Sequence, residues 1–238
     1  MLTQVARPSF YSKNCFEFSA KLDLSAFDVH ATPVRLGIPI PNSLSAAVPK
    51  RQAEYIAGRF AAFSALKLAG FNESIDLTKL PDGSPSWPKG YTGSITHTND
   101  YVSAVVASVE HLRSLGRDTE RILVEKTASE IEGHALRPEE VLRQKNSQLT
   151  VGEYTGLIFS AKESLYKALS PIVQKYFGFQ SAETIAITQH TNNTGRLTLR
   201  LTKPLNNEFQ HGHEFEIQFE ILDQIHTLLE LQQNSKQH

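Results

Sequence analysis

The sequence predicts an α+β protein built from two similar halves, each with a helix followed by about three strands. Apolar residues recur with the 3.6-residue period of a helix near 50–70 and again over 153–170. Alternating apolar and polar residues, the pattern of a half-buried strand, follow each of these segments. The joint falls near 110–115, so the halves are expected over 1–113 and 114–238, although no residue-level repeat relates them.

The first half contains one helix and several candidate strands. Alternating apolar positions predict a strand over about 15–24, and a proline-rich stretch follows it. The helix starts after Pro49 and ends at Gly70, a residue typical of helix C-termini. The segment Leu80–Gly90 is rich in proline and glycine and is expected to be an ordered loop. Three further strands are expected near 93–98, 102–109 and 115–123.

The second half starts with a charged segment over 128–146, in which Pro138 is placed to begin a helix. The clearest helix covers 153–170, because Ile158, Ala161 and Leu165 share one face, and Pro171 is expected to end it. Three alternating segments then predict strands over 184–188, 197–201 and 215–221. The polar end of the chain, Gln232–His238, is expected to be a frayed tail.

The charge balance excludes a general attraction to nucleic acid or to anionic lipid. The 238 residues include 24 Lys and Arg and 25 Asp and Glu, a net charge of −1, so any basic site must be local. The single cysteine, Cys15, excludes an internal disulfide and a cysteine-based zinc site. The sequence contains neither a signal peptide's apolar run nor the ~18 apolar residues of a membrane helix. We therefore expect a cytoplasmic protein without membrane insertion.

Two carboxylates stand two residues apart in the predicted strand over 115–123. The side-chain period of a strand places Asp118 and Glu120 on one face. Two hard oxygen ligands side by side suit Mg²⁺, which binds through one or two carboxylates, water and phosphate oxygens. The alternative, an ordinary solvated strand face, is the commoner meaning of such a pair taken alone.

A second candidate group lies on the helix predicted over 153–170. Glu163 and Lys167 are one helical turn apart, and Lys162 borders the apolar face. The alternative here is a surface ion pair, since Glu followed by Lys four residues later stabilises an isolated helix by ~0.2–0.5 kcal/mol.

Basic residues that could bind phosphate are scattered through the first half. Arg51 and Arg59 lie on the first helix, Lys79 precedes the proline- and glycine-rich loop, and His97 follows Thr96 near the end of a predicted strand. His211 and His213 lack a third ligand candidate and are interpreted as surface residues.

Taken in order, these motifs resemble those of the 4′-phosphopantetheinyl transferases, of the larger type associated with surfactin and enterobactin synthetases. The matching stretches are Arg51–Ala62, Gly83–Gly90, Gly93–His97, Gly116–Glu120 and Phe159–Lys167. The resemblance implies two similar halves packed as a pseudo-dimer, with coenzyme A between them. It also implies transfer of phosphopantetheine from coenzyme A to a serine of an apo carrier-protein domain of a peptide or polyketide synthetase, which releases adenosine 3′,5′-bisphosphate. The family's enterobactin branch favours siderophore assembly, and a monomer is expected.

The resemblance also assigns roles to residues. It implies Mg²⁺ held by Asp118, Glu120 and Glu163, with Glu163 as the general base for the serine proton. Lys162 and Lys167 would neutralise the transferring or leaving oxygens and contact coenzyme A. Five residues of the first half would bind the phosphates and the nucleotide of coenzyme A: Arg51, Arg59, Lys79, Thr96 and His97.

One residue departs from the family pattern. Arg117 stands between Gly116 and Asp118, where the family has an aliphatic residue. We expect that this strand face is exposed or that the arginine has an acidic partner, because an unpaired buried charge costs several kcal/mol. Arg117 also raises the possibility of a catalytically silent protein that binds coenzyme A or a carrier. A separate alternative is an unrelated nucleotide-binding α+β protein whose motifs match by accident.

Overall fold

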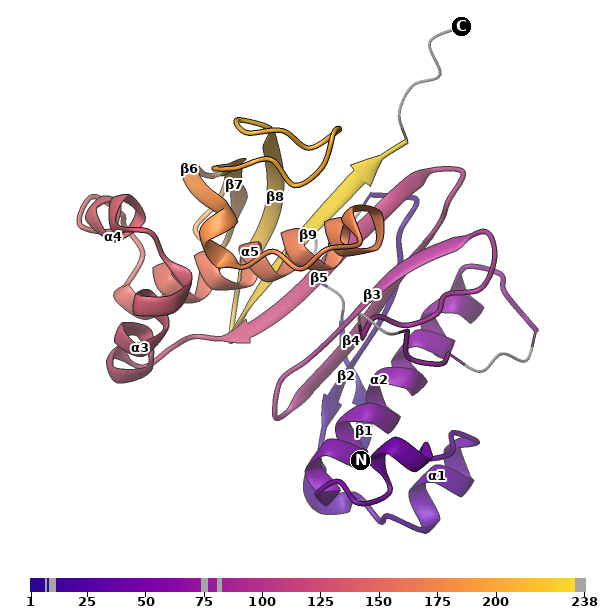
Figure 1. The fold of residues 1–238 in the computed structure, drawn as a ribbon. Coiled ribbons are helices and arrows are strands. Elements are labelled where there is room, and N and C mark those ends of the chain that lie inside the picture. Colours follow the sequence, from indigo (N-terminus) through magenta and orange to yellow (C-terminus); the bar gives the residue numbers. More distant parts are fainter. Residues whose placement is uncertain (7, 9–11, 74–76, 81–82, 234–238) are drawn as a thin grey trace, which may run out of the picture. The chain divides into compact units, whose positions relative to one another are not determined.

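The computed structural model describes residues 1–6, 8, 12–73, 77–80 and 83–233 of the chain. The chain divides into two compact units. The first unit consists mainly of the residues up to Leu112, and the second consists mainly of the residues from Arg113 onward. Each unit combines a β-sheet of antiparallel strand pairs with helices (Figure 1), which confirms the predicted α+β class.

The first unit has a four-stranded sheet in the order β1-β2-β4-β3. Its strands are β1 (Leu2–Gln4), β2 (Phe16–Leu22), β3 (Tyr91–His97) and β4 (Tyr101–Ser108), and its helices are α1 (Ala31–Leu36) and α2 (Pro49–Leu68). Pro49 takes the first position of α2, where a missing N–H costs no hydrogen bond. The helix packs on β2 and β4 through small, fully buried residues that include Ala57 and Ala61.

The second unit has a five-stranded sheet in the order β5-β9-β8-β7-β6. Its strands are β5 (Leu112–Arg121), β6 (Ala182–Gln189), β7 (Thr194–Leu201), β8 (Glu214–Ile221) and β9 (Gln224–Gln232), and its helices are α3 (Glu125–Ala135), α4 (Pro138–Gln144) and α5 (Val151–Val173). A capping box of Thr150 and Glu153 begins α5, which crosses the sheet (Figure 1). The core lies between this helix and β7, β8 and β9.

Glycines allow β5 and α5 to approach each other very closely. A Cβ atom added to Gly116 would lie 1.9 Å from the carbonyl oxygen of Ser164. A Cβ atom added to Gly152 would lie 1.9 Å from the carbonyl oxygen of Leu123. Side chains on β5 and on α5 are therefore held at a short and fixed separation.

The observed elements differ from the predicted ones in several places. The strand predicted over 115–123 is present as β5 and pairs with β9 in the second sheet. Strands β1 and β9 and helix α1 were not predicted. Helix α5 continues past Pro171 to Val173 and ends at Gln174, whose φ of 52° is left-handed. Of the predicted tail, Gln232 ends β9, while residues 234–238 lie outside the described part of the chain.

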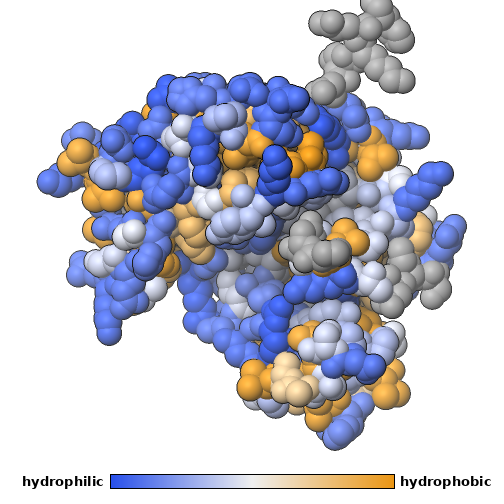
Figure 2. All heavy atoms as spheres, viewed as in Figure 1, coloured by the Kyte–Doolittle hydropathy of each residue, from blue (hydrophilic) through white to orange (hydrophobic). Residues whose placement is uncertain are grey.

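The surface in Figure 2 is mainly hydrophilic, with hydrophobic side chains in separate patches. Within the described ranges, no helix has the length and apolar character that a membrane crossing requires.

Candidate active site

Strand β5 and helix α5 bring the predicted acidic side chains into one neighbourhood of the second unit. Asp118 lies on β5 and is 4% exposed, and Glu120, two residues on, is half-buried. Glu163 and Lys167 lie one turn apart on α5 and are also half-buried. We call Asp118, Glu120 and Glu163 the acidic group.

Both carboxylate oxygens of Asp118 accept hydrogen bonds from α5. The Lys167 ammonium donates to Oδ1 over 2.6 Å, and the Ser160 hydroxyl donates to Oδ2 over 2.8 Å. Lys167 also donates to the backbone carbonyl of Arg117 over 3.2 Å. These contacts attach the helix to the strand at the position of the predicted metal ligand.

The members of the acidic group act on one another through their charges. Burial, together with the charges of Asp118 and Glu163, raises the pKa of Glu120 to about 8, although Lys167 opposes the rise. Burial also raises the pKa of Glu163; Lys167 lowers it and Asp118 adds to the rise. Each shift follows first from burial of the carboxyl group and then from the negative charges confined beside it. A further cation at this place would relieve that repulsion.

The donor chemistry of the acidic group fits Mg²⁺, which prefers carboxylate oxygens and completes its octahedron with water and phosphate oxygens. The side chains as they stand do not form a closed cage: no three His, Cys, Asp or Glu side chains of the described ranges are arranged to hold a metal ion. Lys167 supplies the positive charge on Asp118 in this structure. Since Mg²⁺ needs only one or two protein carboxylates, the group is compatible with such an ion bound together with a phosphate ligand.

Lys162 does not direct its ammonium toward the acidic group. It forms a buried ion pair with Glu140 on α4 over 2.6 Å and donates to the carbonyl of Ala135 over 2.8 Å. Burial lowers the pKa of Lys162, and Glu140 opposes that shift. Glu140 also accepts from the backbone N–H groups of Arg137 and Thr184. The resemblance gave Lys162 the same role as Lys167; the structure places the charge of Lys162 in the contact between α5 and the α3–α4 segment.

Arg117 is fully buried, so the expected exposure of its strand face is wrong. Its guanidinium donates to the backbone carbonyls of Asp118 and Thr227, and it lies 3.0 Å from Nδ1 of His226. Burial and the Arg117 charge lower the pKa of His226 to about 2, which keeps this imidazole neutral. Backbone carbonyls and a neutral ring are thus among the partners of this guanidinium.

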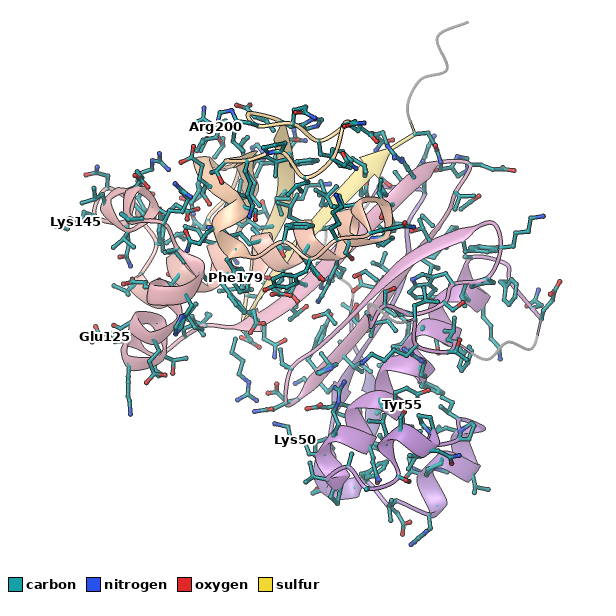
Figure 3. All side chains as sticks on the ribbon, in the orientation of Figure 1. Lys50, Tyr55, Glu125, Lys145, Phe179 and Arg200 are labelled. Atoms are coloured by element: carbon teal, nitrogen blue, oxygen red, sulfur yellow. The ribbon has the colours of Figure 1, made fainter. Side chains whose placement is uncertain are left out.

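A small cavity of about 150 Å³ lies beside Glu163. Four of its nine lining residues are aromatic, among them Tyr166, Phe177 and Phe179. The Phe179 ring packs against α5, with its centroid 5.2 Å from that of Phe159 (Figure 3). A cavity of this size and character holds one apolar group.

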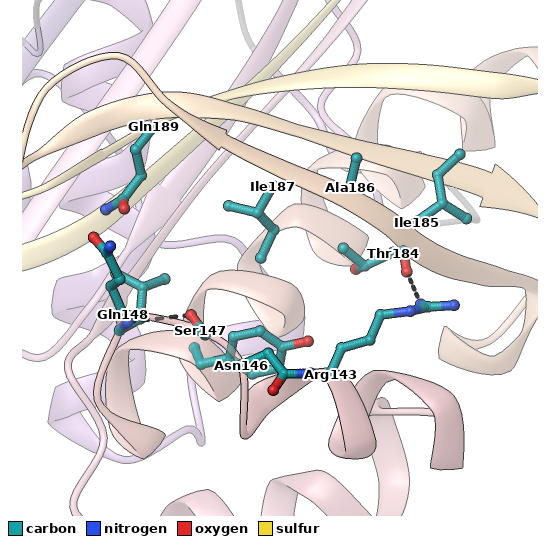
Figure 4. A pocket seen from close by; sticks show the side chains of 11 residues that line it. Arg143, Asn146, Ser147, Gln148, Thr184, Ile185, Ala186, Ile187 and Gln189 are labelled. Atoms are coloured by element: carbon teal, nitrogen blue, oxygen red, sulfur yellow. Dashed lines mark hydrogen bonds between the residues drawn. The ribbon is translucent and has the colours of Figure 1, made fainter.

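A second cavity, of about 270 Å³, lies between the α4–α5 connection and β6 (Figure 4). Amide side chains, those of Asn146, Gln148 and Gln189, form much of its lining, and Arg143 donates to the carbonyl of Thr184 at its edge. The described lining contains none of the site residues predicted from the sequence. The acidic group therefore remains the candidate reaction site.

Comparisons with known proteins agree with this geometry. Residues 41–107 match the 4′-phosphopantetheinyl transferase N-terminal domain, and residues 114–227 match the 4′-phosphopantetheinyl transferase superfamily. The chain is 30% identical over 184 residues to the 4′-phosphopantetheinyl transferase PptT of Mycobacterium tuberculosis, which covers 75% of this chain and 78% of that protein. The chain belongs to the 4′-phosphopantetheinyl transferase superfamily. It is an enzyme that transfers 4′-phosphopantetheine to carrier proteins.

Two further relatives are similar at the same level. The chain is 34% identical over 142 residues to the 4′-phosphopantetheinyl transferase Npt of Nocardia iowensis, covering 58% of this chain and 61% of that protein. It is 34% identical over 166 residues to enterobactin synthase component D of Salmonella typhimurium, covering 70% of this chain and 67% of that protein.

The five residues of the first half that were predicted to bind coenzyme A all lie in the first unit of the transferase. Arg51 is exposed in the first turn of α2 and pairs with Glu54. Arg59 is 8% exposed; its guanidinium carbon lies 4.9 Å from the centroid of the Tyr55 ring (Figure 3), and its Nε has no hydrogen-bond partner among the described residues. Lys79 is exposed, and its backbone forms an isolated antiparallel β-bridge with Pro85. On β3, Thr96 is buried and His97 is exposed.

Sequence reasoning missed the polar residues behind the acidic group of the transferase. Three fully buried hydroxyl residues lie there: Ser160, Ser164 and Thr227. Thr227 is hydrogen-bonded to both serines, and Ser160 also donates to Asp118. A signal for two of them existed, because positions 160, 163, 164 and 167 form a polar stripe with helical spacing. Thr227 gave no such signal, since its strand was not predicted.

Proposed function

We propose that the acidic group binds Mg²⁺ and that Glu163 takes the proton of the carrier serine. The observation that carries this proposal is the joint placement of Asp118, Glu120 and Glu163 beside Lys167 on β5 and α5. Bound Mg²⁺ would neutralise the diphosphate of coenzyme A and polarise it toward attack. Asp118, Glu120 and Glu163 are the residues that would hold it.

The residues of the chain have separate tasks in the transfer. The serine oxygen of the carrier bonds to the β-phosphorus of coenzyme A, the bond to the bridging oxygen breaks, and adenosine 3′,5′-bisphosphate leaves. Glu163 accepts the serine proton, directly or through water, and its raised pKa brings it nearer to the working pH of a general base. The Lys167 ammonium stabilises the negative charge that develops on the phosphate oxygens.

We assign the nucleotide and the phosphates of coenzyme A to Arg51, Arg59, Lys79, Thr96 and His97. Arg59 supports this assignment best, because its buried Nε has no protein partner in the described chain and its plane lies over an aromatic ring. Replacing Arg59 by Leu is expected to raise the Kd for coenzyme A at least about 10-fold, as loss of a charged hydrogen bond does. The matched control Arg35→Leu, in the short helix α1, should leave that Kd unchanged in calorimetry.

The carriers that we propose as partners belong to siderophore, nonribosomal peptide or polyketide synthesis. The similarity to enterobactin synthase component D supports a siderophore pathway. Rates of transfer to apo peptidyl carriers and to an apo fatty-acid acyl carrier, compared at equal concentration, test this assignment. A strong preference for the fatty-acid carrier would overturn it.

The decisive test is mass spectrometry of an apo carrier after incubation with the protein, coenzyme A and Mg²⁺. The carrier should gain one phosphopantetheine, and adenosine 3′,5′-bisphosphate should appear in equal amount. Glu163→Gln is expected to slow this transfer by about 10²–10⁴-fold, the usual contribution of a general base. The control Glu153→Gln changes a glutamate at the start of the same helix and should remain active. An equally fast Glu163→Gln variant would show that the assigned base is wrong.

A further inference from the structure

A chain of three buried hydroxyls ends on the Asp118 carboxylate. Ser164 Oγ lies 2.8 Å from Thr227 Oγ1, Thr227 Oγ1 lies 2.9 Å from Ser160 Oγ, and Ser160 Oγ lies 2.8 Å from Asp118 Oδ2. Two of these side chains come from α5 and one comes from β9. All three residues are 0% exposed, so water cannot replace a missing partner in this chain. We call these residues the hydroxyl chain.

Counting protons gives the direction in which the hydroxyl chain donates. Each hydroxyl has one proton, and the ionised Asp118 carboxylate only accepts. Ser160 therefore donates to Asp118, which leaves its oxygen as an acceptor. The Thr227 hydroxyl donates to Ser160, whose Oγ lies 2.9 Å away and whose backbone carbonyl lies 3.0 Å away. Ser164 likewise donates to Thr227, whose Oγ1 lies 2.8 Å away and whose backbone carbonyl lies 3.3 Å away.

This arrangement holds both oxygens of the Asp118 carboxylate. Ser160 donates to Oδ2 while Lys167 donates to Oδ1. Held by two donors on different oxygens, the carboxylate is oriented before any cation arrives, which is the arrangement that outer partners of metal ligands provide.

We infer that Ser160 and Thr227 are positioning residues that orient Asp118 for a divalent cation. This inference rests on the proposed function, in which Asp118 is a ligand of Mg²⁺. Neither hydroxyl touches the reacting atoms. Ser160 acts on Asp118 directly, and Thr227 acts through Ser160, so the effect of losing each hydroxyl should fall with its distance from the carboxylate.

The test measures Mn²⁺ binding by electron paramagnetic resonance, with coenzyme A present and a protein-free blank subtracted. Ser160→Ala is expected to weaken Mn²⁺ binding by about 10–100-fold, the usual cost of removing an outer partner. Thr227→Val keeps the shape and removes the hydroxyl, and it should weaken binding by less than Ser160→Ala. Thr227→Ser keeps the hydroxyl and should restore the affinity.

A matched control separates positioning from simple loss of stability. Ser114 is 3% exposed on the same strand as Asp118, and its hydroxyl donates to the carbonyl of Ala168 over 2.7 Å. Ser114→Ala therefore removes one buried hydroxyl bond, as Ser160→Ala does. It should lower the melting temperature to a similar degree while leaving Mn²⁺ affinity unchanged.

The outcomes distinguish this inference from the proposed function. If the parent transfers phosphopantetheine but Ser160→Ala binds Mn²⁺ as tightly as Ser114→Ala, the inference is wrong and the proposed function stands. If the parent binds no Mn²⁺ and modifies no carrier, the proposed function fails, and the inference fails with it. Weakened Mn²⁺ binding in Ser160→Ala and Thr227→Val, at the stability of the control, supports the inference.

Discussion

The buried ion pair between Lys162 and Glu140 allows a sharp test of what Lys162 does. The two side chains are 2% and 0% exposed, and their charged atoms are 2.6 Å apart. Lys162→Met removes the ammonium and keeps an unbranched side chain of similar length. Glu140 would then keep two donors, the backbone N–H groups of Arg137 at 2.7 Å and Thr184 at 2.5 Å.

The expected magnitude follows from these remaining contacts. Removing one partner of a buried ion pair costs about 3–5 kcal/mol. Lys162→Met should lie at the lower end, about 3 kcal/mol, because two N–H groups still stabilise the carboxylate. Glu140→Ala should lie at the upper end, since it leaves the ammonium and both N–H groups without their acceptor. The double variant Lys162→Met/Glu140→Gln removes both charges and should be more stable than either single variant.

The assay is urea unfolding followed by far-ultraviolet circular dichroism. Tryptophan fluorescence would be misleading, because the sole tryptophan, Trp87, lies in the first unit. The KM for coenzyme A, measured on the same variants under folded conditions, should change little. The opposite pattern would refute the reasoning. In that case the unfolding free energy of Lys162→Met would lie within about 0.5 kcal/mol of the parent's, as for most surface substitutions, and its KM for coenzyme A would be strongly raised. Lys162 would then be a phosphate-binding residue.

Three further predictions concern the surroundings of the acidic group. Gly116→Ala places a Cβ 1.9 Å from the Ser164 carbonyl oxygen, so we expect the unfolding free energy to fall by at least about 1–3 kcal/mol and transferase activity to be lost. The control Gly133→Ala adds a Cβ in open space on α3, so the unfolding free energy should rise by about 0.5–1 kcal/mol in the same denaturation assay. The pKa of Glu120 is about 8 in the folded protein and about 4.5 in the unfolded chain. Between these two pH values the folded protein keeps a proton on Glu120 that the unfolded chain has lost. The metal-free parent should therefore lose stability relative to Glu120→Gln as the pH rises from 4.5 to 8; a constant difference in melting temperature would contradict the shift. The pKa of His226 shifts in the opposite direction, from 6.5 in the unfolded chain to about 2 in the folded protein. The parent should therefore lose stability relative to His226→Gln as the pH falls from 7 to 5. A constant difference in melting temperature over this range would contradict a buried neutral imidazole.

Local patterns were sufficient to predict much of the fold and the acidic group. Alternation revealed β2, and the helical period revealed α5, because each of these elements has one face that is more deeply buried than the other. Once α5 and β5 were recognised, the spacing of Asp118 with Glu120 and of Glu163 with Lys167 placed each pair on one face. Their proximity in space is a tertiary fact that the motif resemblance supplied.

Patterns failed where both faces of an element are buried or where a charge is buried. Residues Ile225–Leu229 of β9 are buried on both faces, which removes the alternation that identifies a strand. Alternation also carries no information about the partner strand, so the pairing of β5 with β9 was not predicted. Lys162 and Arg117 are charged residues that hydropathy places at the surface. Their partners, Glu140 and His226, are 22 and 109 residues away in sequence.

The close approach at Gly116 and Gly152 determines where the alignment of α5 against β5 is encoded. Gly116 on β5 meets the carbonyl oxygen of Ser164, and Gly152 at the start of α5 meets the carbonyl oxygen of Leu123, just beyond β5. A shift of one residue at either point would bring a side chain into a carbonyl oxygen, so the alignment depends on these two contacts. The residues that join them, from 124 to 150, make neither contact, so insertions or deletions there can reshape the outside of the enzyme while both contacts stay as they are.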